Sequence, residues 1–184
     1  MAASGPEICD FGWKAPEFSL PGVDGGMHGP ATARGDRGLL VMFICNHCPY
    51  VRSIIDRIVR DTADLAELGI GSIAVMSNDT ESYPADSFDR MKIFSRENEF
   101  GFPYVIDETQ AVARSYDAVC TPEFYGFNAD LELQYRGRLD ESGRAAVPGA
   151  RRDLFEAMRL IAETGGGPDR QIASIGCSIK WRAA

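Results

Sequence analysis

The sequence predicts a single α/β domain with a central mixed sheet flanked by helices. Two observations predict this class. Apolar runs of strand length alternate with segments whose apolar residues recur at helical spacing. A later pair of alternating apolar segments, separated by turn-forming residues, adds an antiparallel hairpin. With 184 residues the chain fits one hydrophobic core better than two. We therefore expect one domain over residues 1–184, with an N-terminal extension (1–37), a core (38–165) and a tail (166–184).

The elements of the first half follow from local patterns. "DGG" at residues 24–26 follows the alternating "FSL" and predicts the turn of an N-terminal β-hairpin. "GLLVMFI" at residues 38–44 is uniformly apolar, as in a strand that is covered on both faces. Apolar residues then recur with helical spacing over residues 51–68 until a glycine stops them. "IGSIAVMS" at residues 70–77 predicts a second buried strand.

The second half adds an inserted helix, a strand, a short helix, a hairpin and a last helix. The inserted helix has Asp86 or Ser87 as its start signal. The remaining elements are a strand in "FPYVID", a short helix in "TQAVARSYDA", a hairpin that turns at Asn128 to Asp130, and a helix in "ARRDLFEAMRLIAE" that ends at a run of glycines. The tail from Pro168 receives no assignment.

Composition narrows the classes of partner. Lysine and arginine total 19 against 27 aspartates and glutamates, a formal charge of -8, which does not favour binding to nucleic acid or to anionic lipid. No apolar run is long enough to cross a bilayer, and the N-terminus lacks the pattern of a secretory signal. We therefore expect a cytoplasmic protein, a compartment in which a close cysteine pair more often serves catalysis or metal binding than structure.

"CNHC" at residues 45–48 is the main chemical signal. Cys45 and Cys48 lie where a buried strand gives way to a helix, and a helix start offers free N–H groups and a partial positive charge that stabilise a thiolate. His47, when protonated, adds a positive charge nearby. The spacing lets one thiol attack a disulfide and the other resolve the mixed disulfide. We expect Cys45 to be the ionised attacking sulfur and Cys48 to resolve.

Two alternatives remain at this point. A zinc site would need further ligands, and the remaining candidates, among them Cys120, are dispersed along the chain without a second paired motif. The cysteines could also be inert core thiols. The helix start is open too: Pro49 suits the first helical position if Cys48 is the cap, but falls late if Cys45 is the cap.

The chain resembles the thioredoxin superfamily, specifically its redoxin branch of proteins related to the AhpC/TSA peroxiredoxins. The resemblance is carried by "APEFSL", "CNHC", "SNDTESYP", "FPYVIDE" and "CTPEFYGF" followed by "YRGRLD". It implies a thioredoxin-like fold in which Thr121-Pro122 forms a cis-proline loop facing the cysteine pair. It also implies that the exposed backbone of this loop receives a substrate chain by strand pairing.

The sequence departs from both well-known subfamilies. "CNHC" replaces the usual thioredoxin "CGPC", and Cys45 stands where a peroxiredoxin has a threonine, three residues before Cys48. We therefore expect a thiol–disulfide oxidoreductase. The alternatives are a thiol peroxidase acting on hydroperoxides and a metal-binding or non-catalytic protein of the same fold. No cofactor and no metal is expected. The expected partners are a protein or small-molecule thiol or disulfide and an external thiol reductant.

Four further residues complete the candidate set. Cys120 directly precedes the cis-proline candidate and is either an auxiliary thiol near Cys45 or a small buried residue. Cys177 is either a mobile resolving thiol or an anchor of the tail. Glu123 is expected to be a surface carboxylate, and Arg136 is expected to point to solvent from the hairpin.

Overall fold

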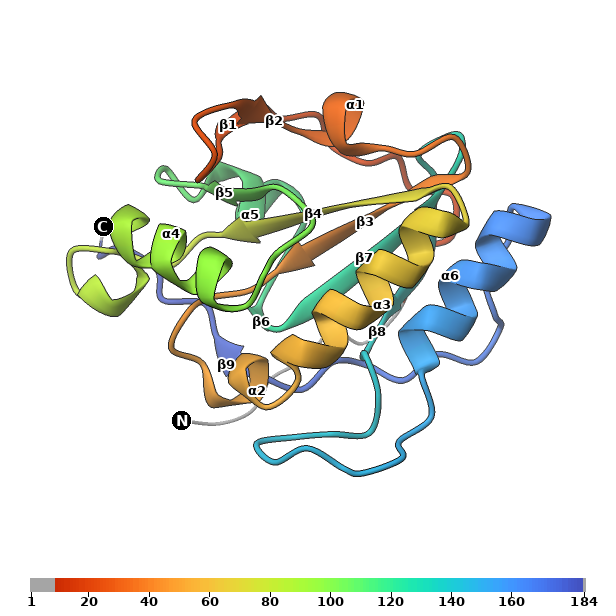
Figure 1. Cartoon of the computed structure of the whole chain (residues 1–184). Coiled ribbons are helices and arrows are strands. Elements are labelled where there is room, and N and C mark those ends of the chain that lie inside the picture. The colour runs from red at the N-terminus through yellow and green to blue at the C-terminus, as the bar shows by residue number, and fades with distance from the viewer. Residues whose placement is uncertain (1–8, 184) are drawn as a thin grey trace.

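The computed structural model describes residues 9–183. Its centre is a five-stranded mixed sheet, shown in Figure 1, with strand order β5, β4, β3, β7, β8. The bounds are β3 Gly38–Phe43, β4 Ile70–Met76, β5 Tyr104–Ile106, β7 Glu123–Asn128 and β8 Leu133–Gly137. Strands β3, β4 and β5 are mutually parallel, while β7 is antiparallel to β3 and to β8. The expected α/β architecture with an edge hairpin is confirmed.

Two apolar layers cover the sheet. One layer packs under α3 (Ile55–Glu67), α4 (Phe88–Glu97) and α6 (Asp153–Thr164), and it contains Cys45, Cys48 and Cys177. The other layer packs under α5 (Ala111–Ser115) and the N-terminal segment. Because both faces are covered, every residue of β3 and of β7 is buried.

The extension forms the expected hairpin from β1 (Leu20–Pro21) and β2 (Met27–His28), followed by α1 (Pro30–Ala33). Gly25 has a φ of +87° in the turn, a conformation that glycine adopts without strain. The inserted helix α4 begins as predicted, with Ser87 accepting a hydrogen bond from the Arg90 N–H, and a short turn η1 (Pro84–Asp86) precedes it. Within the described residues, no helix is both long and apolar enough to span a bilayer.

The helix expected over residues 51–68 is instead two helices. The first is α2 (Pro49–Arg52), and α3 follows after a break at Ser53 and Ile54. At the break the Ser53 hydroxyl bonds the carbonyls of Tyr50 and Gly143, while Ile54 leaves helical geometry with φ -126° and ψ 4°. Apolar spacing continues across the break because both helices bury the same face, so the spacing alone did not reveal it.

The tail, which had no assignment, contributes a strand. Residues Cys177–Ser178 form β9, which pairs antiparallel with β6 (Cys120–Thr121). A two-residue strand has too few positions for periodicity to predict it.

Candidate active site

The "CNHC" segment leaves the sheet at the end of β3 and enters α2. Cys48 is the N-cap of α2 and Pro49 occupies its first turn, so Cys45 lies outside the helix. This settles the cap position that the sequence left open. Proline is favourable there because its missing N–H would have no helical partner and its fixed φ suits the helix. The arrangement leaves the free N–H groups of the helix start near the Cys48 sulfur rather than near Cys45.

The cis-proline loop faces the two cysteines. The Thr121-Pro122 bond is cis, as expected. The Cys45 sulfur lies 3.5 Å from the Thr121 hydroxyl, and the Cys48 sulfur lies 3.1 Å from the Thr121 carbonyl oxygen. Cys45 is 1% exposed and Cys48 is fully buried. All five cysteines are free thiols.

The structure favours the thiolate on Cys48, which differs from the expectation that Cys45 is ionised. The Cys45 thiol is the main cause that lowers the pKa of Cys48 to about 5, and the backbone N–H groups of Val51 and Cys177 act in the same direction against the opposing effect of burial. The neighbouring Cys48, together with burial, raises the pKa of Cys45. The Thr121 carbonyl at 3.1 Å suits a protonated Cys48 instead. The Cys45 thiol and two backbone N–H groups favour the Cys48 thiolate, whereas the Thr121 carbonyl alone favours the thiol. We therefore assign the lower pKa to Cys48.

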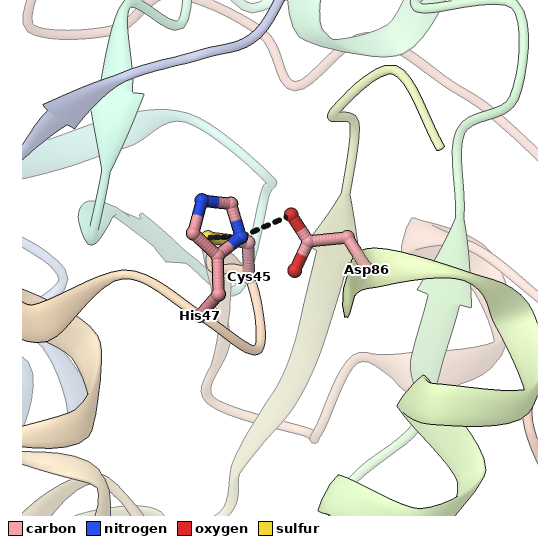
Figure 2. A group of neighbouring side chains, drawn as sticks. All are labelled: Cys45, His47 and Asp86. Carbon is pink, nitrogen blue, oxygen red and sulfur yellow. Dashed lines mark hydrogen bonds and ion pairs between the residues drawn. The ribbon is translucent and has the colours of Figure 1, made fainter. Parts of the chain in front are cut away.

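His47 is held by a buried carboxylate that sequence reasoning did not identify. Its Nδ1 lies 2.7 Å from Asp86 Oδ2 and 4.0 Å from the Cys45 sulfur, as Figure 2 shows. The Nδ1 proton therefore belongs to the Asp86 contact, since 4.0 Å is long for a thiol hydrogen bond. This hydrogen bond raises the pKa of His47. The imidazole also stacks on Tyr83, with ring centroids 5.8 Å apart.

Asp86 itself is fully buried and organises the loop. Its carboxylate accepts hydrogen bonds from the Asn46 backbone N–H at 2.9 Å and from the Asn78 amide at 2.8 Å. The Asn46 side chain donates to the Ala85 carbonyl and accepts from the Tyr104 hydroxyl. The sequence offered Asp86 only as a helix-start signal. Its contact with a loop 40 residues earlier depends on the fold and has no local pattern.

A metal ion has one candidate position among the described residues. Ligand atoms of Cys45, His47 and Asp86 lie within 4.8 Å of one another. The alternative ligand set weighed from the sequence included Cys120, whose thiol contacts other groups. A thiolate, an imidazole and a carboxylate are each competent zinc ligands. In this geometry, however, His47 Nδ1 and the Asp86 carboxylate are hydrogen-bonded to each other, so these two ligand atoms are already engaged.

The expected exposed edge of the cis-proline loop is not exposed, which corrects the sequence expectation. Thr121 is 3% exposed, and its strand β6 is paired with the chain's own β9, with Thr121 opposite Cys177. A Cβ at residue 176 would collide with the Thr121 carbonyl oxygen, so Gly176 permits this close approach. The edge that a substrate chain was expected to pair with is therefore occupied by the tail.

Cys120 faces a second buried carboxylate rather than Cys45. Its sulfur lies 3.7 Å from the Pro122 carbonyl and 4.0 Å from Glu123 Oε2, and burial raises its pKa. Glu123 is fully buried, and Arg136 binds it through two nitrogens at 2.8 and 3.1 Å. The expectations of a surface carboxylate and of a solvent-facing Arg136 are both wrong. The sheet is covered on both faces, so alternation along the hairpin does not mark a solvent side.

A cleft of about 600 Å³ opens beside His47, between the "CNHC" loop and α4. Two exposed arginines, Arg52 and Arg90, are part of its lining. A cleft of similar volume, about 620 Å³, lies between β8 and α6 and contains none of the cysteines. The cleft beside His47 is not lined by a cysteine either, but it is lined by Asn46 and His47, the two residues between Cys45 and Cys48, so it is the better candidate for access to the thiols.

Comparison with known proteins identifies the fold and the family of the chain. Two crystal structures match over 100% of this chain: an uncharacterized conserved protein from Geobacillus kaustophilus (41% identity, 98% of that chain, TM-score 0.94) and a hypothetical protein from Sinorhizobium meliloti (31% identity, 100% of that chain, TM-score 0.92). A putative thiol:disulfide interchange protein from Chlorobium tepidum shares the fold at 21% identity over 84% of this chain and 99% of that one (TM-score 0.64). No curated protein matches the sequence. The AhpC/TSA family model matches residues 11–139, and the chain belongs to this family within the thioredoxin superfamily.

Proposed function

We propose that the protein is a thiol–disulfide oxidoreductase in which Cys45 and Cys48 cycle between a dithiol and a disulfide. The observation that carries the proposal is that two buried thiols meet the same residue: the Cys45 sulfur lies 3.5 Å from the Thr121 hydroxyl and the Cys48 sulfur 3.1 Å from the Thr121 carbonyl oxygen. In this setting the neighbouring Cys45 thiol lowers the pKa of Cys48 to about 5. A thiol that ionises below neutral pH supplies the nucleophile, and a neighbouring thiol supplies the resolving group. Membership of the AhpC/TSA family and the fold of the structural neighbours support a redox function.

In the proposed cycle Cys48 attacks first. Its thiolate attacks one sulfur of a substrate disulfide, and the other substrate sulfur leaves as a thiol. Cys45 then attacks the Cys48 sulfur of the mixed disulfide, releasing the second half of the substrate as a thiol and leaving the Cys45–Cys48 disulfide. An external thiol reductant restores both cysteines. Asp86 raises the pKa of His47, and the protonated imidazole balances negative charge beside the two sulfurs.

The closed site favours a small substrate. Both sulfurs are almost completely buried, and the tail occupies the strand edge that a polypeptide would use. We propose a low-molecular-weight disulfide that enters from the cleft beside His47, where Arg52 and Arg90 suit a substrate with carboxylates.

The test is a redox titration. The protein is equilibrated in a series of glutathione and glutathione-disulfide buffers, quenched in acid, and its disulfides are mapped by mass spectrometry. We expect a Cys45–Cys48 disulfide that appears and disappears as one two-electron couple, unchanged in the control Cys9→Ser. Absence of this disulfide in every buffer would overturn the proposal.

The order of attack is tested in a Cys177→Ala background with hydroxyethyl disulfide. Under this proposal the Cys45→Ser variant retains a mercaptoethanol adduct on Cys48, while the Cys48→Ser variant reacts slowly at neutral pH. The reverse pattern would assign the first attack to Cys45, as the sequence alone suggested.

A second candidate is a thiol peroxidase that reduces hydroperoxides. The observation that favours it is the combination of a low-pKa thiol and a closed site, which a peroxide can enter more easily than a disulfide. Rapid consumption of hydrogen peroxide by the reduced protein, lost in Cys48→Ser, would establish this activity. Slow consumption equal to that of free cysteine would exclude it.

A further inference from the structure

Cys48 has a second thiol neighbour, contributed by the tail. Cys177 lies opposite Thr121 in the β6–β9 pair, and the Thr121 carbonyl is 3.1 Å from the Cys48 sulfur. Cys45, Cys48 and Cys177 belong to one continuous apolar cluster, and Cys177 is 7% exposed. Cys48 is among the causes that raise the pKa of both other thiols, Cys45 and Cys177. Cys48 is thus the shared neighbour of two thiols.

The tail is held in the position expected of a substrate. Its strand pairs with the cis-proline loop in the antiparallel manner by which a peptide is added to a sheet edge. The pairing is fixed on both sides of Cys177: Gly176 passes close to the Thr121 carbonyl, and the Ile179 N–H donates to the Val119 carbonyl at 3.0 Å. The thiol that this strand presents to Cys48 is that of Cys177.

We propose that Cys177 is a third redox-active cysteine, which replaces Cys45 as the disulfide partner of Cys48 by internal thiol–disulfide exchange. This inference rests on the proposed Cys45–Cys48 disulfide. The Cys177 sulfur attacks the Cys48 sulfur, the Cys48–Cys177 bond forms, and the Cys45–Cys48 bond breaks. Cys45 leaves and takes up the proton that Cys177 gives away. No electrons are gained or lost overall, so the step needs no additional oxidant.

Oxidation of Cys48 prepares Cys177 for this step. In the dithiol state, burial first and then the hydrogen bond and negative charge of Cys48 raise the pKa of Cys177 to about 11. When Cys48 is part of a disulfide its charge and its acceptor role are lost, so the two causes that come from Cys48 disappear. The Cys177 thiol then ionises more easily when the Cys48 sulfur has become electrophilic. The raised pKa of Cys45 makes it easy to protonate once it has left.

The decisive experiment uses the full chain with Cys45→Ser and hydroxyethyl disulfide. Cys48 first acquires a mercaptoethanol adduct, and Cys177 then displaces it. We expect the final product to be monomeric, to carry no mercaptoethanol, and to contain a Cys48–Cys177 disulfide by peptide mapping. Retention of the adduct on Cys48 in all molecules would overturn the inference.

Two matched variants define the controls. Cys45→Ser combined with Cys9→Ser should behave as Cys45→Ser alone, because Cys9 is not part of the apolar cluster that holds Cys48. Cys45→Ser combined with Cys177→Ser should retain the adduct, and Cys177→Ala in its place serves if the serine variant does not fold. Loss of the adduct to Cys120 in these variants would count against a specific role for Cys177.

A further variant separates this inference from the proposed function. Cys177→Ala, with Cys45 and Cys48 intact, should still form the Cys45–Cys48 disulfide in glutathione buffers. If it does not, the proposed function fails. If it does, while Cys45→Ser keeps its adduct, only the role of Cys177 fails.

Discussion

Two buried cysteine–carboxylate groups lie near the cis-proline loop, and they differ in the cation that neutralises the carboxylate. Asp86 and Glu123 are both fully buried. Asp86 is paired with His47, whose charge depends on pH, whereas Glu123 is paired with Arg136, whose charge does not. We call them the Asp86 group and the Glu123 group.

The difference shows which environment suits a reactive thiol. In the Glu123 group, Cys120 has a carboxylate 4.0 Å away, and burial and this charge together raise its pKa. In the Asp86 group, His47 lies between the carboxylate and Cys45, and the partner Cys48 receives donors from a helix start and from the tail. The first arrangement stabilises structure with a permanent ion pair. The second retains a group that can exchange protons beside the sulfurs.

The largest expected effect is the loss of folding stability when the Glu123–Arg136 ion pair is broken. Arg136→Met leaves Glu123 buried without its cation, and removing one partner of a buried pair costs roughly 3–5 kcal/mol. We expect the free energy of unfolding in urea to fall by this amount. Adding Glu123→Gln to Arg136→Met should recover part of the loss. A loss below about 1 kcal/mol would show that the Glu123 group is not a tightly coupled ion pair.

The next largest effect is expected in the Asp86 group, on folding stability and on the pKa of His47. The Asp86 carboxylate is contacted by three donors, from Asn46, Asn78 and His47. In Asp86→Asn an amide nitrogen faces one of these donors, which then has no acceptor. An unsatisfied buried polar group lowers the free energy of unfolding by about 1–3 kcal/mol. Because the Asp86 hydrogen bond is the main cause of the raised pKa of His47, this pKa should fall.

Proton NMR titration measures that pKa directly. The chain contains only two histidines, so His28→Gln assigns the resonances. An unchanged His47 pKa in Asp86→Asn would contradict the charge pairing described for this group. In Asp86→Asn the pKa of Cys45 should also fall, because the Asp86 charge is one cause of the raised pKa of Cys45.

A smaller effect is expected at Cys120. Cys120→Ala removes a buried sulfur that packs as a small apolar group, so we expect about 1 kcal/mol of lost stability. The glutathione redox equilibrium of Cys45 and Cys48 should not change. A shifted equilibrium would restore the role of auxiliary thiol that the sequence left open for Cys120.

Much of the fold and the centre of the site could be predicted because their signals are local. The "CNHC" motif depends on a few adjacent residues, whereas the cis bond at Thr121-Pro122 was expected from the family resemblance that "CTPEFYGF" carries. The buried strands and amphipathic helices are long enough for periodicity to show. The break at Ser53 was missed because it leaves the apolar face unchanged.

The remaining features depend on contacts between distant segments. Asp86 reaches the "CNHC" loop across 40 residues, and Cys177 reaches Cys48 through a strand of only two residues. Glu123 and Arg136 alternate as solvent-facing residues would, yet the N-terminal segment covers that face. The thiolate was expected on Cys45 because the sequence did not fix the helix cap, and the cap position moves the free N–H groups to Cys48.

The smallest expected effect is a difference between the two groups in the pH dependence of stability. His47 has a raised pKa in the folded protein, so its pairing with Asp86 contributes fully below the unfolded histidine pKa of about 6.5. That contribution to folding stability is lost as pH rises through the pKa of His47 in the folded protein.

Cys48 acts in the opposite sense. Because its pKa is lowered in the folded protein, it contributes most to stability at alkaline pH and less as pH falls towards about 5. The His47 effect is therefore measured as a difference: in a Cys48→Ser background, the stability lost on adding His47→Gln should shrink as pH rises above about 6.5. The loss caused by Arg136→Met combined with Glu123→Gln, which removes both charges of the other pair, should stay constant over the same range. A constant His47 difference would mean that Asp86 binds the neutral imidazole as strongly as the cation, and the contrast between the two groups would disappear.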